Sequence, residues 1–117
     1  MIDDKAQDLG RLIGQTEEYK ALRRASDRLR EDAECQKLLT EMERLAGEIE
    51  AAGRQGKEPT PEQSEQYDRA VQAIQGSPVY QAMAAAQANF EKMMAKVNSR
   101  IYEGIQKGAA SPIITLS

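Results

Sequence analysis

The pattern of apolar positions along this chain is helical, because apolar residues recur at every third or fourth position over most of its length. The longest regular stretch runs from Pro78 to about Lys107. Apolar residues there follow an eleven-residue period in two series: Val79, Phe90 and Ile101, and Met83, Met94 and Ile105. Eleven residues over three turns is close to the relaxed period of an α-helix, so the pattern predicts one nearly straight final helix.

This final helix is too long for a compact molecule of 117 residues. About 28 residues extend about 42 Å along a helix axis, whereas a globule of this size is about 35 Å across. We therefore expect an elongated molecule that associates with a second copy. The stripe expected to face a bundle core or a dimer interface comprises Met83, Phe90, Met94, Val97 and Ile101.

A seven-residue repeat marks an earlier helix, which we expect to begin after Asp32. Its two apolar series are Cys35, Met42 and Ile49, and Leu38, Leu45 and Ala52. This spacing favours a left-handed packing seam. The residues expected in the core or at an oligomer interface are Leu38, Met42, Leu45 and Ile49. The repeat does not continue backwards to Leu22 and Leu29, so the sequence predicts a kink or a capped restart at Asp32.

Start and stop signals divide the rest of the chain into shorter helices. Residues 2–13 form an amphipathic helix, and Thr16 can cap the next one. Two glycines and a proline within residues 53–59 predict a turn. Residues 60–63 read Thr-Pro-Glu-Gln, which is a capping box, and Ser77 precedes a proline at the start of the last helix.

These elements predict an all-α fold, namely an elongated helical bundle of about four to five helices, two of them long, that forms a dimer. Composition agrees, because aromatic residues make up only 4% of the chain and good helix formers dominate its apolar content. We expect one helical domain over residues 1–107. Residues 108–117 are expected to form a tail that ends in a short apolar, β-prone patch.

The chain lacks the residues of the commonest catalytic and metal sites. It has no histidine and a single cysteine, Cys35, so zinc motifs, imidazole bases and Ser-His nucleophiles are absent from the sequence. We expect no enzymatic activity, no metal and no cofactor. Cys35 falls in an apolar series and is expected in the core. A reactive or intermolecular thiol is the alternative, because the first turn of a helix activates a thiol.

Net charge and hydropathy limit the kinds of partner and the cellular location that we expect. The formal net charge is −3, so the whole chain does not attract nucleic acid or anionic lipid. The charged start at residues 1–5 and the absence of a window of about 20 apolar residues predict a cytoplasmic protein without a membrane span.

Basic residues are unevenly distributed. Residues 17–37 carry equal numbers of both signs, which predicts local neutralisation of Arg23, Arg24, Arg28 and Arg30. One face of the final helix collects Lys92, Lys96, Arg100 and Lys107, with Glu103 as the one acid among them. This face is the best candidate for an anionic partner such as RNA. No aromatic side chain lies among these cations to stack a base, which favours a solvated face instead.

The order and spacing of particular segments carry a family resemblance. These are Tyr19-Lys20-Ala21-Leu22, the restart at Asp32, Lys37-Leu38-Leu39, Gly56-Lys57-Glu58-Pro59-Thr60, Ser77-Pro78-Val79-Tyr80 and Phe90-Glu91-Lys92-Met93-Met94. In this order the chain resembles the YlbF/YmcA family of small bacterial helical proteins over about residues 2–105.

The resemblance implies an all-α dimer or higher oligomer with a cytoplasmic regulatory role and no catalysis. Some family members act in competence, sporulation and biofilm control, in a complex that adjusts the endoribonuclease RNase Y. Members of that complex are linked to iron–sulfur clusters through extra cysteines, which this chain lacks, so no cluster is expected here.

Two main function classes follow. The first is a regulatory adaptor that forms a homodimer and binds a protein such as an endoribonuclease or a paralogue. The alternative is a direct RNA binder that uses the basic face of the last helix. A thiol-based redox sensor at Cys35 is a third hypothesis.

Overall fold

Five α-helices make up the described part of the chain. The computed structural model describes residues 1–110, and no strand occurs among them. The helices are α1 (Ile2–Gly14), α2 (Glu17–Glu31), α3 (Ala33–Arg54), α4 (Pro61–Gln75) and α5 (Pro78–Ala110). The predicted all-α class is confirmed. The apolar patch expected in the tail lies at residues 111–117, outside the described residues.

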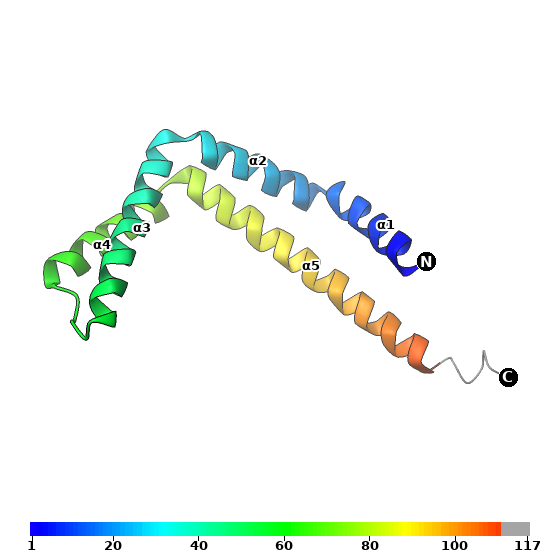
Figure 1. Cartoon of the computed structure of the whole chain (residues 1–117). Helices are drawn as coiled ribbons and strands as arrows, with labels where there is room; N and C mark the ends of the chain where they lie inside the picture. Colours follow the sequence, from blue (N-terminus) through cyan, green and yellow to red (C-terminus); the bar gives the residue numbers. More distant parts are fainter. Residues whose placement is uncertain (111–117) are drawn as a thin grey trace.

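The helices form two arms that meet at an angle (Figure 1). In the long arm, α2 packs along the first half of α5 and α1 continues beyond α2, whereas α3 and α4 pack together as a hairpin arm. The molecule measures 72 × 36 × 19 Å and has a radius of gyration of 21.9 Å. A compact chain of this length has a radius of gyration of about 13 Å. The predicted elongation is therefore confirmed.

Local side-chain bonds fix where the helices begin. The hydroxyl groups of Thr16, Thr60 and Ser77 each accept a hydrogen bond from the backbone N–H three residues further on, at 3.1–3.4 Å. The Gln63 side chain returns a bond by accepting from the Thr60 N–H at 3.1 Å, which completes the predicted capping box. These three predicted helix starts are confirmed.

One residue turns the chain between the two arms. Asp32 has an extended backbone, and its carboxylate accepts a hydrogen bond from the Cys35 N–H at 2.8 Å, so it caps the start of α3. The side-chain amide of Gln36 donates to the carbonyl oxygen of Leu29 at 2.8 Å and occupies an acceptor at the end of α2. The predicted capped restart at Asp32 is confirmed, and it directs α3 away from α5.

The far end of α5 differs from the prediction. The helix continues through Gly108 to Ala110, so the first three residues of the predicted tail are helical. Glycine costs an exposed helix only about 1 kcal/mol relative to alanine, which is too little to end a regular helix by itself.

The core is small and divided between the two arms. Among residues 1–110, six apolar side chains are buried: Ala25, Cys35, Leu45, Ala70, Ile74 and Ala86. Cys35 and Leu45, each 1% exposed, are the largest that are fully buried. In the hairpin arm Leu45 is buried, and Leu38, Met42 and Ile49 of the same α3 stripe are half-buried.

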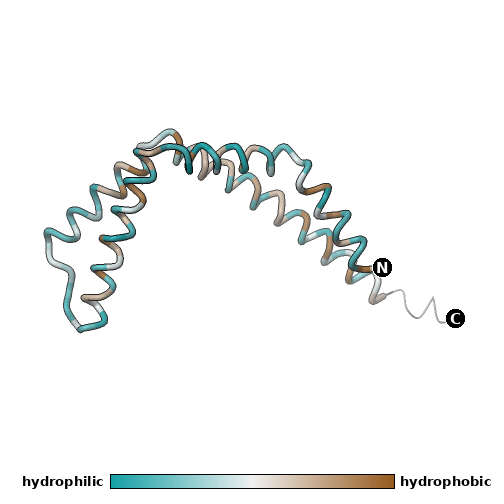
Figure 2. Tube along the Cα trace, turned by 45° about the horizontal axis from the view of Figure 1, so that its top comes forward, coloured by the Kyte–Doolittle hydropathy of each residue, from teal (hydrophilic) through white to brown (hydrophobic). Residues whose placement is uncertain are grey.

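Aromatic and sulfur contacts hold α2 against α5. The rings of Tyr19 and Phe90 pack with centroids 5.8 Å apart and planes tilted by 58°. Nearer the corner, the Ser26 hydroxyl donates a hydrogen bond to the sulfur of Met83 at 3.4 Å. These contacts cover the first half of α5, and Figure 2 shows that apolar segments also recur along its far half.

Candidate interaction surface on the long arm

The far half of α5 is poorly covered. Beyond α2 only α1 runs beside it, and no residue of α1 is buried. The exposed large apolar side chains of the described residues all lie at this end of the long arm: Met1, Ile2, Leu12, Ile101, Tyr102 and Ile105. Ile2 is 82% exposed and Ile105 is 60% exposed. Exposed apolar side chains that gather on a folded surface are typical of protein-contact sites.

An open groove of about 450 Å³, which we call the distal groove, lies between α1 and α5 at this end. It is lined by Leu9 of α1 and by Met93, Lys96, Val97, Arg100 and Ile101 of α5. Its apolar lining, which we call the floor, consists of the half-buried Leu9, Met93 and Val97 together with Ile101. The two cations that line it are exposed. This arrangement suits an amphipathic helix, whose apolar face would cover the floor while polar groups meet the cations.

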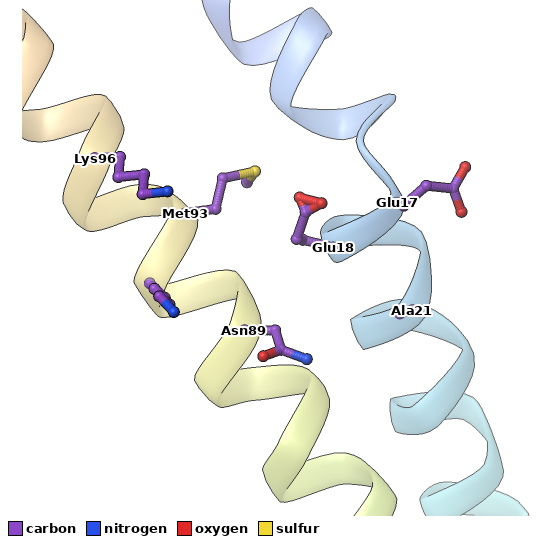
Figure 3. A pocket seen from close by; sticks show the side chains of 7 residues that line it. Glu17, Glu18, Ala21, Asn89, Met93 and Lys96 are labelled. Carbon is purple, nitrogen blue, oxygen red and sulfur yellow. The ribbon is translucent and has the colours of Figure 1, made fainter.

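A second hollow of about 560 Å³ separates α2 from α5 (Figure 3). This α2–α5 crevice is lined by Glu17, Glu18 and Ala21 of α2 and by Asn89, Lys92, Met93 and Lys96 of α5. Glu18 points across the crevice toward Met93, whereas Glu17 points away from it. Met93 and Lys96 line both hollows, so the α2–α5 crevice and the distal groove form one continuous surface.

The predicted α5 stripe begins as core and ends as surface. Met83 and Phe90 contact α2, Met94 and Val97 are half-buried, and Ile101 is 45% exposed. The interface role predicted for the stripe stays a prediction, and its far end is the part that remains free for a partner.

The four cations predicted to form one basic face have different surroundings. Lys92 and Lys96 are exposed and line the α2–α5 crevice. Arg100 is paired with Glu103 at 3.0 Å, and Lys107 is exposed near the end of α5. Their role toward an anionic partner stays a prediction.

Three arginines on α2 were missed as candidates. Arg23, Arg24 and Arg28 are exposed, and none has an ion pair among residues 1–110. The other arginines in this range each contact a carboxylate three or four residues away. Neutralisation by an ion pair therefore holds for Arg30 and is wrong for these three. Asp27, which is three and four residues from Arg24 and Arg23, is paired with Arg30 instead.

Charge pairing is also strong at one place on the hairpin arm. Arg44 donates to both carboxylate oxygens of Glu41, and it donates to Glu48 at 2.7 Å. This hydrogen-bonded guanidinium lowers the pKa of Glu41, and the two carboxylates raise the pKa of Arg44. The three side chains lie on an exposed face of α3.

No three or more histidine, cysteine, aspartate or glutamate side chains of residues 1–110 form a group that could hold a metal ion. Within the same range, no helix has the length and apolar content required to cross a bilayer. Cys35 packs at the corner of the two arms with 1% exposure, which favours its predicted core role over that of a reactive thiol.

Comparison with known proteins supports the predicted resemblance. The family described as "Control of competence regulator ComK, YlbF/YmcA" matches residues 2–106. The fold is similar to that in the X-ray crystal structure of Bacillus subtilis RicA in complex with RicF, with a TM-score of 0.81 and 20% identity over 92% of this chain and 96% of that chain. No curated protein sequence matches. Because the family match spans nearly the whole chain, this protein belongs to the YlbF/YmcA family.

Proposed function

We propose that this protein is a non-enzymatic regulatory adaptor of the cytoplasm that works as a homodimer and binds other proteins through its helices. The single observation that carries the proposal is the gathering of exposed apolar side chains around the distal groove. The family description names control of a competence regulator, and the RicA structure contains that protein together with RicF, so both support a role in protein contacts.

The extent of the surface supports a dimer. The accessible surface is 9254 Å², whereas a compact monomer of 13.0 kDa exposes about 6,300 Å². The difference of about 2,900 Å² per chain leaves ample room for a stable interface, which buries about 800 Å² on each partner.

Light scattering at micromolar concentration tests the homodimer. The expected mass is about twice the 13.0 kDa of one chain. Ile101→Asp puts a charge on the apolar floor of the distal groove, so it should return the mass to one chain while the helical circular dichroism is kept. Ala51→Asp, on an exposed position of α3, is the matched control and should stay dimeric. A wild-type mass of one chain would overturn the homodimer.

The adaptor role has a separate test. The expected partner is an endoribonuclease or a paralogue from the same host. Interferometry with the purified partner measures whether it binds this protein saturably. Ala51→Asp should bind as the wild type does. If neither candidate binds the wild-type protein at micromolar concentration, the adaptor role toward these partners is wrong.

Direct RNA binding is the second candidate function. It is favoured by exposed cations that have no ion pair among residues 1–110, among them Lys92 and Lys96 on α5 and Arg23, Arg24 and Arg28 on α2. An RNA mobility assay at two salt concentrations separates the two functions. Tight binding that falls steeply with salt supports the RNA binder, and no binding near physiological salt rejects it.

A further inference from the structure

The α2–α5 crevice holds opposite charges that do not meet within one chain. Lys92 and Lys96 stand on the α5 wall, and Glu18 extends from α2 into the space between the helices (Figure 3). None of the three has an ion pair among the described residues. Elsewhere along the chain, carboxylates and cations at helical spacing are paired repeatedly. Both walls of the crevice therefore carry charged side chains without an ion pair among the described residues.

We propose that this crevice is part of the homodimer contact, in which Lys92 and Lys96 of one copy pair with Glu18 of the second copy. The inference rests on the proposed homodimer and adds its register, that is, which side chains of the two copies face each other. Met93 and Lys96 line both the crevice and the distal groove. A helix of the second copy that covers the apolar floor of the groove therefore passes directly over the charged walls of the crevice.

The mixture of signs points to a second copy as the occupant. A two-fold interface uses the same patch on both chains, so a patch that carries both signs can match each charge with its opposite on the other copy. A polyanion would meet Glu18 as a like charge, and a purely basic segment would meet Lys92 and Lys96. Like charges brought together in this way oppose association.

The size of the expected effect follows from partial burial. Glu18 is half-buried in the single chain, and a covering helix would remove further water from it. Ion pairs gain strength as the surrounding dielectric falls, whereas exposed pairs contribute little. Reversing one partner should therefore weaken self-association by about ten-fold or more at low salt.

Charge reversal in trans tests the register. The Lys92→Glu/Lys96→Glu variant and the Glu18→Lys variant should each dimerise more weakly than the wild type, because like charges then face each other twice. An equimolar mixture of the two should form heterodimers with an affinity close to that of the wild type, because both contacts regain opposite charges. Native mass spectrometry counts the heterodimers, since the two chains differ in mass.

Two controls define the outcomes. Glu43→Lys makes the same change of charge on an exposed position of α3 in the hairpin arm, away from the crevice, and should leave the dimer affinity unchanged. In 1 M salt the loss in the reversed variants should shrink, because the Debye length falls to about 3 Å. Lys92→Gln/Lys96→Gln, which removes charge without reversing it, should show a smaller loss in the same direction.

The result that overturns the register is distinct from the result that overturns the dimer. If the wild type is dimeric but the mixture forms no excess of heterodimer, the proposed pairing is wrong and the homodimer stands. If the two reversals restore the dimer only when combined in one chain, the charges pair within that chain, and the proposed contact is again wrong.

Discussion

At the scale of single residues, stability is concentrated in very few side chains. Leu45, which is 1% exposed, and Ile74, which is 2% exposed, are the largest of the buried side chains among residues 1–110. Leu45 sits at the centre of the stripe that joins α3 to α4. Removing its side chain leaves a cavity in a hairpin that has few other buried groups to compensate.

We therefore expect Leu45→Ala to lower the free energy of unfolding by about 2–5 kcal/mol, because buried Leu→Ala changes lose both transfer energy and packing. Urea unfolding followed by circular dichroism measures the change. Lys37→Ala is the control on an exposed position of the same helix, and it should change stability by less than about 0.5 kcal/mol. Equal losses in the two variants would contradict the importance of the hairpin core.

At the scale of elements, short-range hydrogen bonds determine where each helix begins. The corner between the arms depends on Asp32, which follows the last residue of α2 and caps the first turn of α3. Its carboxylate replaces the helical partner that the Cys35 N–H lacks at a helix start.

Asp32→Ala should lower the free energy of unfolding by about 0.5–2 kcal/mol through the loss of this cap. Asp32→Asn keeps a side-chain oxygen at the same position and should retain most of the stability. Urea titration of the three proteins under identical buffer makes the comparison. A fall in the asparagine variant as large as that in the alanine variant would show that the negative charge matters rather than the cap.

At the scale of the whole molecule, the accessible surface of the chain is large and its buried core is small. Its two arms share few contacts, and its apolar groups at the far end of the long arm are exposed within the described range of residues 1–110. Association would join those groups and so stabilise the folded chain by mass action.

The thermal midpoint of the wild type should therefore rise as protein concentration increases, because binding that occurs only in the folded state stabilises it. Ile101→Asp should unfold at a lower temperature that does not depend on concentration. Differential scanning calorimetry over a hundred-fold range of concentration measures both. A midpoint independent of concentration in the wild type would contradict association.

Local features could be predicted from the sequence, whereas the use of surfaces could not. Caps at Thr16, Asp32 and Thr60 depend on residues within three positions, so the printed order of residues determines them. The eleven-residue period correctly placed Phe90 and Ile101 on one stripe. Periodicity does not say what covers a stripe, so it could not separate the half-buried Phe90 from the exposed Ile101.

Charge arithmetic failed for a related reason. A balanced count over residues 17–37 says nothing about which carboxylate reaches which arginine. Asp27 can serve only some of its neighbours, and its contact with Arg30 leaves Arg23 and Arg24 without partners. The side-chain conformations decide which arginine contacts a given carboxylate. A count of charges along the sequence does not include this information.

The unbroken run of α5 has a mechanical consequence. Its 33 residues make a rod about 50 Å long, which α2 and α4 contact near its start and which only α1 accompanies farther along among residues 1–110. A rod of this kind is a lever, so a small rotation at its root near Pro78 becomes a displacement of several ångströms at its tip. Binding of a partner at the far end of α5 would therefore change the angle between the long arm and the hairpin arm. The partner would not need to contact the corner that joins the two arms.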